Sequence, residues 1–310
     1  MIGTSVPTRF AGTVTNQEPM TSIAPDVGLA ALREAFQLLA NETRIEILHA
    51  LWTRPTWEAT FTELKTVVGM RDSGQFQYHL DKLVGTFIKR TDHGYTHLAG
   101  SIALYRAMLG TLGGPDSVSS IMLDTPCPAC DRSLRLIYEN QVFAARCPSC
   151  EESVLSSPFL PAGIIDRSNN ELLSAFDTWS RKPVDLLQSG VCPWCRSTVS
   201  HTFEQRDDPE EVRITHRCDR CQGFLTTHVG EVILSDPAVV TFFYLLGRDI
   251  TVPPYWSLPF CMTSNGVTVL SKAPWAVEQT IRYQGETLCL HLDDDMTTNV
   301  MECSLSVLGH

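Results

Sequence analysis

The sequence lacks the features that mark secreted, membrane-spanning and catalytic proteins. Residues 1–20 have no basic start and no apolar core of about 7 to 15 residues, both of which a signal peptide needs. No run approaches the roughly 18 consecutive apolar residues of a membrane-spanning helix, and the chain has no glycine-rich phosphate loop and no nucleophile motif. These absences predict a cytoplasmic protein that has no membrane partner and is not an enzyme.

Basic side chains are also scarce. The 310 residues include 24 Lys and Arg against 35 Asp and Glu, for a formal net charge of −11. The imbalance is uneven, because residues 1–110 carry ten basic and ten acidic side chains whereas residues 111–310 carry fourteen and twenty-five. An acidic surface repels phosphate groups, so this charge distribution disfavours broad contact with nucleic acid through residues 111–310.

Cysteine is absent before Cys127, and eight of the eleven cysteines then fall into four Cys-x-x-Cys pairs that form two brackets. The first bracket comprises Cys127, Cys130, Cys147 and Cys150, and the second comprises Cys192, Cys195, Cys218 and Cys221. Two thiolates with two residues between them can bind one side of a tetrahedral ion, and a hairpin brings the second pair to the other side. Each bracket therefore predicts a closed, structural zinc site, which makes two zinc ions in all.

Other uses of the cysteines fit less well. Disulfides need an oxidising compartment, which the missing signal peptide disfavours. A redox Cys-x-x-Cys motif follows a strand in a βαβ pattern, whereas these pairs come doubled and stand among Pro and Gly residues. Iron stays open as an alternative occupant of a four-thiolate site. Cys261, Cys289 and Cys303 are expected to be buried small hydrophobic residues.

The first hundred residues begin with an arm, residues 1–25, that has no periodicity. Apolar residues at helical spacing then predict helices over residues 29–39, residues 42–52 and residues 61–68. The side chain of Asn41 is expected to cap the second of these helices.

A fourth helix is expected from Asp72 or Ser73 to Leu83. Its apolar residues face inward and leave amide, phenol and ammonium groups outward, the groups that contact base edges and phosphates in a major groove. Residues 87–98 follow as a hairpin with basic side chains, the form of a wing. The predicted DNA contacts are Arg71, Ser73, Gln75, Gln77, Tyr78, His79, Lys82, Lys89, Arg90 and His93. An ordinary solvated helix face is the alternative.

Two segments resemble a known family. Residues 38–48 (LLANETRIEIL) and 73–85 (SGQFQYHLDKLVG) are similar to the winged helix-turn-helix of ArsR-like transcription regulators, in the version of halophilic archaea that can carry cysteine-rich C-terminal regions. The resemblance covers about residues 28–110. It implies a homodimer assembled through the first and last helices of the domain. The last helix is expected over residues 101–109. Metal sensing of the family's known kinds is not expected, because residues 101–109 contain no His, Asp or Glu.

The two brackets are followed by similar patterns, which predict two related zinc-ribbon-plus-helix units. Alternating apolar residues beyond Thr251 then predict antiparallel strands over residues 267–270, 277–281 and 288–292. Arginines between the cysteine pairs are compatible with a protein partner or small effector, which we favour, or with a second contact to DNA. Three histidines near the second bracket are expected to be structural. They are His201, His216 and His228.

The predicted fold class is α+β, with an N-terminal winged helix-turn-helix, two zinc-ribbon-plus-helix units and a C-terminal antiparallel β segment. The expected domains are residues 26–112, 120–190 and 191–310. This organisation predicts a transcription regulator that binds double-stranded DNA at specific sequences and carries a zinc-stabilised interaction or effector domain. The alternative is a general transcription-machinery factor that resembles archaeal initiation factor E, which also joins a winged helix to a zinc ribbon.

Overall fold

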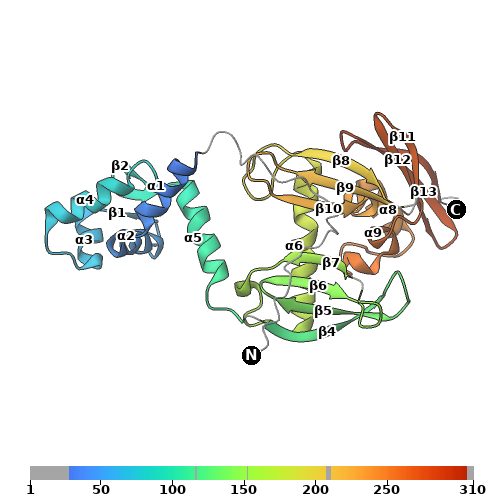
Figure 1. Ribbon diagram of the computed structural model, residues 1–310, viewed down its shortest axis with the longest axis horizontal. Helices are drawn as coiled ribbons and strands as arrows, with labels where there is room; N and C mark the ends of the chain where they lie inside the picture. Colours follow the sequence, from blue (N-terminus) through green and yellow to red (C-terminus); the bar gives the residue numbers. More distant parts are fainter. Residues whose placement is uncertain (1–27, 116, 152, 207–210, 306–310) are drawn as a thin grey trace, which may run out of the picture. The chain divides into compact units, whose positions relative to one another are not determined.

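The computed structural model describes residues 28–115, 117–151, 153–206 and 211–305. The predicted arm, residues 1–25, lies outside the described residues. The chain divides into two compact units, one within Pro25–Gly113 and one that begins at Gly114; we call them the N-terminal and the C-terminal unit. Both combine helices with antiparallel sheets, so the fold is α+β (Figure 1).

The N-terminal unit consists of short helices and a small three-stranded sheet of order β1-β3-β2. Its elements are α1 (Leu29–Leu39), α2 (Glu42–Trp52), β1 (Glu58–Ala59), α3 (Phe61–Val68), α4 (Ser73–Leu83), β2 (Ile88–Thr91), β3 (Gly94–His97) and α5 (Ala99–Thr111). Polar side chains begin three of the helices: Asn41 accepts the N–H of Arg44, Thr60 and Glu63 form a reciprocal capping box, and Asp72 accepts the N–H of Gln75.

The core of the N-terminal unit lies among α2, α3, α4 and the hairpin of β2 and β3. Leu51, Leu64, Phe76 and Leu80 are fully buried in it. The hairpin packs closely against β1 at Gly94, where a Cβ would lie 2.2 Å from the carbonyl oxygen of Ala59. Only a glycine permits this approach, so the position of the hairpin depends on that residue.

Over its described residues, the C-terminal unit contains three antiparallel sheets with helices between them. The first part comprises β4 (Ser117–Pro126), β5 (Ser133–Glu139), β6 (Val142–Arg146), β7 (Ser153–Pro158), η1 (Pro161–Gly163) and α6 (Asn169–Gln188). The second comprises β8 (Ser200–Gln205), β9 (Val212–Arg217), β10 (Phe224–His228), α7 (Val229–Ile233) and α8 (Pro237–Leu245). The last comprises η2 (Tyr255–Ser257), α9 (Pro259–Met262), β11 (Val267–Lys272), β12 (Trp275–Tyr283), β13 (Glu286–Asp293) and β14 (Thr298–Ser304).

Helix α6 joins the first two sheets, as Figure 1 shows. Its N-terminal half contributes Leu172 and Phe176 to the core beneath β4–β7, where the Phe176 ring lies 4.8 Å from that of Phe143. Its C-terminal half contributes Val184 to a second core that includes Phe203 of β8. The two cysteine brackets therefore belong to one compact unit.

Two elements differ from the sequence-based expectation. The spacing of Leu172, Phe176 and Trp179 predicts a helix near residues 170–179. Helix α6 instead continues to Gln188, because Val184 and Leu187 carry its buried stripe past Pro183. Strand β14 was not expected, since nearly all of its residues are exposed and show no apolar alternation. No helix among the described residues is both long and apolar enough to cross a membrane.

Candidate metal centres and nucleic-acid interface

The structure brings the cysteines of each bracket to one place. In both groups the four Sγ atoms lie within 4.8 Å of one another. The Sγ atoms of Cys130 and Cys147 are 3.4 Å apart, and those of Cys195 and Cys218 are also 3.4 Å apart. Four sulfurs placed about 2.3 Å from a tetrahedral ion would be about 3.8 Å from each other. Each group therefore has the ligand set and the spacing to hold a metal ion.

All four Cys-x-x-Cys pairs form the same turn. The residue after the second cysteine has a positive φ of 58° to 66°, and its N–H donates to the carbonyl of the first cysteine at 2.9–3.0 Å. The four residues at this position are Asp131, Glu151, Arg196 and Gln222. The turn also aims backbone N–H groups at sulfur, as Ser149 N–H does toward Cys147 Sγ at 3.4 Å. Such donors favour the thiolate, which is the metal-binding form.

The thiols in each group differ widely in their readiness to ionise. Backbone hydrogen bonding, chiefly from Cys150, lowers the pKa of Cys147 to about 6. Burial raises the pKa of Cys221 to about 12. Since a bound cation favours deprotonation of all four sulfurs, these closely spaced thiols suit a metal site better than an empty cluster.

The first cysteine of each pair is buried, with exposed fractions of 0–1%, and the second lies nearer the surface. Four cysteines complete a tetrahedral shell and leave no position for a substrate, so such a site stabilises the fold. Within the part of the chain that the structure describes, no other three His, Cys, Asp or Glu residues bring their ligand atoms together.

Most of the remaining cysteines, and the histidines near the second group, are at least partly buried, so packing explains their presence. Cys261 and Cys289 are buried as expected, whereas Cys303 is exposed on β14, so that expectation was wrong for Cys303. His216 is fully buried on β9 and bonds Thr227 Oγ1 at 3.0 Å. Burial lowers the pKa of His216 to about 3, which keeps the ring neutral.

The predicted DNA contacts lie on and around α4. The exposed ones are Arg71, Ser73, Gln75, Tyr78, Lys82, Lys89, Arg90 and His93, and the half-buried ones are Gln77 and His79. The apolar stripe of Phe76, Leu80 and Leu83 faces the core, which leaves the polar side chains of α4 outward.

Asp81 holds part of this surface together. Its Oδ1 accepts from Gln77 Nε2 at 2.8 Å and from Arg90 Nη2 at 2.7 Å, so it ties α4 to β2. Gln77 and Arg90 thus each use a hydrogen-bond donor within the protein. Among the described residues, the side chains of Gln75 and Lys82 form no hydrogen bond with Asp81. Lys82 Nζ lies 5.6 Å from the centre of the Tyr78 ring.

One cation at this surface was not predicted from the sequence. Lys65 Nζ, on α3, donates to Ser73 Oγ at 2.6 Å and therefore stands at the start of α4. A lysine in the last turn of the preceding helix was the available indication. His79 is half-buried, and its Nδ1 has no hydrogen-bond partner among the described residues.

A second surface of the N-terminal unit is apolar. Helix α1 has no buried residue, and α5 buries only Ser101. The exposed apolar side chains are Leu29, Leu32 and Phe36 on α1 and Leu104, Met108 and Leu109 on α5. Tyr105 is instead engaged within the unit, with its ring 4.7 Å from that of Trp52.

The C-terminal unit contains a small cavity beside α6, of about 10 Å³, which is room for one water molecule. Ser180, Arg181, Glu231 and Tyr255 are among the residues that line it. Ser180 Oγ is buried without a hydrogen-bond partner in the described residues. A single water molecule would satisfy that hydroxyl, so this cavity supplies no site for a larger effector.

The fold and the two cysteine groups define an α+β protein with two candidate metal centres. Residues 124–298 match the family described as Domain of unknown function (DUF7351). Since this match spans more than half of the chain, the chain belongs to that family. Residues 32–108 match a second family, described as Domain of unknown function (DUF7347). No curated protein and no solved structure matches the chain.

Proposed function

We propose that this protein is a cytoplasmic, dimeric transcription regulator that binds double-stranded DNA at specific sequences through a winged helix-turn-helix in its N-terminal unit. One observation carries the proposal: α4 presents a polar outer face beside a basic hairpin. The order α3, short turn, α4 and hairpin is that of a helix-turn-helix followed by a wing. The resemblance of residues 28–110 to ArsR-like regulators supports the same function.

In this proposal α4 is the recognition helix. Gln75 and Tyr78 contact base edges in the major groove, where an amide can read an adenine bidentately. Lys82, one turn further along, contacts a phosphate. Arg71 and Ser73 anchor phosphates at the start of α4, and the Lys65 ammonium on Ser73 adds positive charge there.

The wing contributes a second contact. Lys89, Arg90 and His93 are exposed on the hairpin and lie beside the minor groove in this proposal. Arg90 also forms an exposed ion pair with Asp81, which links the wing to the recognition helix. The Asp81 carboxylate further offsets positive charge at this surface, which favours a limited, register-dependent contact over general adhesion to DNA.

Dimerisation uses the apolar surface of α1 and α5. Phe36 is 60% exposed and Met108 is 53% exposed, although both are large apolar side chains. A second copy of the chain would cover these residues, as the resemblance to ArsR-like regulators implies. Two recognition helices related by a two-fold axis then match the halves of a palindromic operator.

The cysteine groups hold two zinc ions in this proposal. The donor set is four sulfurs in both groups, and thiolate is a preferred ligand of zinc in closed structural sites. The zinc-stabilised C-terminal unit contacts another protein or receives an effector, since its acidic character disfavours broad contact with duplex DNA.

The decisive experiment is genome-wide immunoprecipitation of the tagged protein with sequencing of the recovered DNA, for wild type and for a Gln75→Ala, Tyr78→Ala, Lys82→Ala triple variant. A few sharp peaks that share a palindromic motif, and that the variant loses, would support the proposal. Broad occupancy of active promoters that the variant retains would contradict it. That outcome would favour the general transcription-machinery factor instead.

A further inference from the structure

The two cysteine groups share their backbone turns but differ in the side chains that the turns display. In the first group, Ala129 and Ser149 stand inside the pairs, and the positive-φ positions after them carry Asp131 and Glu151. In the second group, Trp194 and Arg196 occupy positions equivalent to Ala129 and Asp131. Because the same turn forms with small or acidic side chains in the first group, the fold does not require the tryptophan and the arginine that the second group displays.

Two aromatic rings are exposed at the second group. Trp194 is 45% exposed and Phe224 is 41% exposed. The indole of Trp194 lies across Gly223, where a Cβ would come within 2.4 Å of its ring. Trp194 therefore bridges the two turns of the group, and Phe224 follows immediately at the start of β10. A ring fixed on backbone in this way keeps an open face toward solvent.

Three arginines lie on these turns and on the strand beside them. Arg217 pairs with Phe224 across β9 and β10, with its Cζ 5.3 Å from the centre of the ring. Arg196 Nη1 donates to the Trp194 carbonyl at 2.9 Å, and Arg220 is exposed on the second turn. Within the described residues none of these guanidinium groups forms an ion pair. Asp219 is the acidic side chain in these turns, and a zinc ion bound by the four thiolates would add a formal charge of −2, so the three guanidinium groups bring the local charge to about zero in an otherwise acidic unit.

We propose that this surface binds unpaired nucleotides of DNA. We call it the aromatic–arginine surface and define it as Trp194, Arg196, Arg217, Arg220 and Phe224. Exposed aromatic rings can stack on bases only where those bases are not already stacked in a duplex, and guanidinium groups beside them neutralise the phosphates between successive bases. The choice of DNA over RNA rests on the proposed function, because the recognition helix would bring the C-terminal unit to the same DNA.

The test measures binding of a fluorescein-labelled 12-residue thymidine oligonucleotide by fluorescence anisotropy. The full-length protein carries the Gln75→Ala, Tyr78→Ala, Lys82→Ala substitutions, which remove the proposed duplex contacts. This background is expected to retain binding, and adding Trp194→Ala or Phe224→Ala should weaken it on the order of 5- to 150-fold, the worth of one stacked base. Trp194→Tyr should restore most of the affinity because it keeps a flat ring.

Arg217→Ala tests the electrostatic part separately. It should weaken binding and reduce the dependence of log affinity on log salt by about 0.7, the value for one phosphate contact on a single strand. Two matched controls should leave affinity unchanged: Tyr244→Ala, which removes an exposed aromatic ring from α8, and Arg132→Ala, which removes an exposed arginine beside the first group. Metal content and thermal unfolding of every variant report whether the turns remain folded.

Several results would overturn the inference. One is that the triple variant, with no further substitution, does not bind the oligonucleotide. Another is that adding Trp194→Ala or Phe224→Ala leaves the affinity unchanged while the protein stays folded. A third is that the triple variant binds a 12-base-pair duplex as tightly as the single strand. Tighter binding of a uridine 12-mer or of a glutamate-rich peptide would assign the surface to RNA or to an acidic protein. None of these results bears on the operator peaks that test the proposed function, so the two can fail independently.

Discussion

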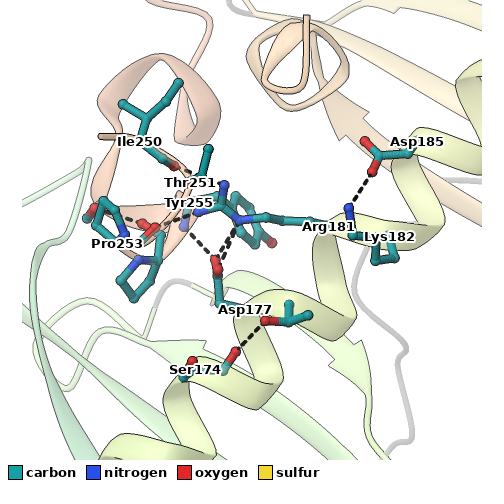
Figure 2. A network of polar contacts seen from close by, with 12 residues as sticks. Ser174, Asp177, Arg181, Lys182, Asp185, Ile250, Thr251, Pro253 and Tyr255 are labelled. Carbon is teal, nitrogen blue, oxygen red and sulfur yellow. Dashed lines mark hydrogen bonds and ion pairs between the residues drawn. The ribbon is translucent and has the colours of Figure 1, made fainter. Parts of the chain in front are cut away.

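Arg181 and Asp177 form a buried ion pair one turn apart on α6, with Arg181 Nε 2.9 Å from Asp177 Oδ2 (Figure 2). Both partners also bind the segment before η2. Arg181 donates to the carbonyl of Ile250 at 3.1 Å and to that of Pro253, and Asp177 accepts the Tyr255 N–H at 2.7 Å. This pair therefore fixes the chain that follows α8 against α6, the helix that joins the first two sheets of the C-terminal unit.

Removing the arginine should destabilise the C-terminal unit. In Arg181→Ala the Asp177 carboxyl, whose pKa burial already raises, stays buried without its counter-charge. We expect a loss of roughly 3–5 kcal/mol in the free energy of unfolding, the usual cost of breaking a buried pair. Urea denaturation followed by tryptophan fluorescence measures it.

Lys182→Ala is the matched control for that experiment. It removes the adjacent Lys182–Asp185 pair on the same helix, which is largely exposed and should change stability by less than about 1 kcal/mol. Similar losses for the two variants would contradict a special role for the buried pair.

Stability should fall as pH rises through the range in which Glu231 ionises. Burial raises the pKa of Glu231 from 4.5 to about 7, against a hydrogen bond from the His228 N–H that lowers it. The folded state therefore keeps a proton that the unfolded chain releases above about pH 4.5, and this contribution to stability is lost as pH rises toward 7.

The comparison of wild type with Glu231→Gln isolates this effect. Gln accepts the same hydrogen bond but does not titrate, so the stability of wild type relative to the variant should drop by up to about 3 kcal/mol between pH 4.5 and 7.5. Acid release of metal from the cysteine groups is common to both proteins. A constant difference across this range, measured by urea denaturation, would count against the raised pKa.

Each cysteine group should hold one zinc ion independently. Cys127→Ser and Cys192→Ser are each expected to lower the bound metal from two ions per chain to one and to cost stability, since a closed shell loses a ligand. Inductively coupled plasma mass spectrometry on the purified proteins checks the identity and number of ions. Cys303→Ser, at an exposed cysteine outside both groups, should retain two.

Two residues of α4 should affect DNA binding in different ways. Lys82→Ala should weaken binding to all sequences and reduce the salt slope by about 1, as expected for one phosphate contact. Gln75→Ala should cost about 1–3 kcal/mol on the preferred operator and less on others, which relaxes base preference. Gel-shift titrations on the preferred and a scrambled duplex separate the two; equal loss on both from Gln75→Ala would remove it as a base reader.

A charge placed in the apolar surface of α1 and α5 should produce monomers. Phe36→Glu and Met108→Glu each insert an unpaired carboxylate into the proposed dimer contact, which should shift the mass measured by light scattering from two chains to one. Val252→Glu, at an apolar residue that is 75% exposed in the C-terminal unit, should leave the mass unchanged. A wild type that is already monomeric would contradict the dimer itself.

Much of the local structure followed from short-range patterns in the sequence. Asn41 and Asp236 cap the helices after them because a side-chain oxygen can satisfy a free N–H wherever a helix begins. Phe76 and Leu80 predicted the buried side of α4 through their spacing alone. The cysteine brackets were predictable for the same reason, since two residues between ligands is a local geometric requirement.

Contacts between distant residues decided what the patterns could not. No spacing rule links Asp177 with Tyr255, or Lys65 with Ser73, because such pairs depend on how separate elements pack. The sequence determined where the helices begin, which faces they bury and which cysteines belong together. Tertiary structure decided that both cysteine groups share one unit joined by α6, that Trp194 lies against Gly223 and that Arg217 lies over the ring of Phe224, since long-range packing alone sets those distances.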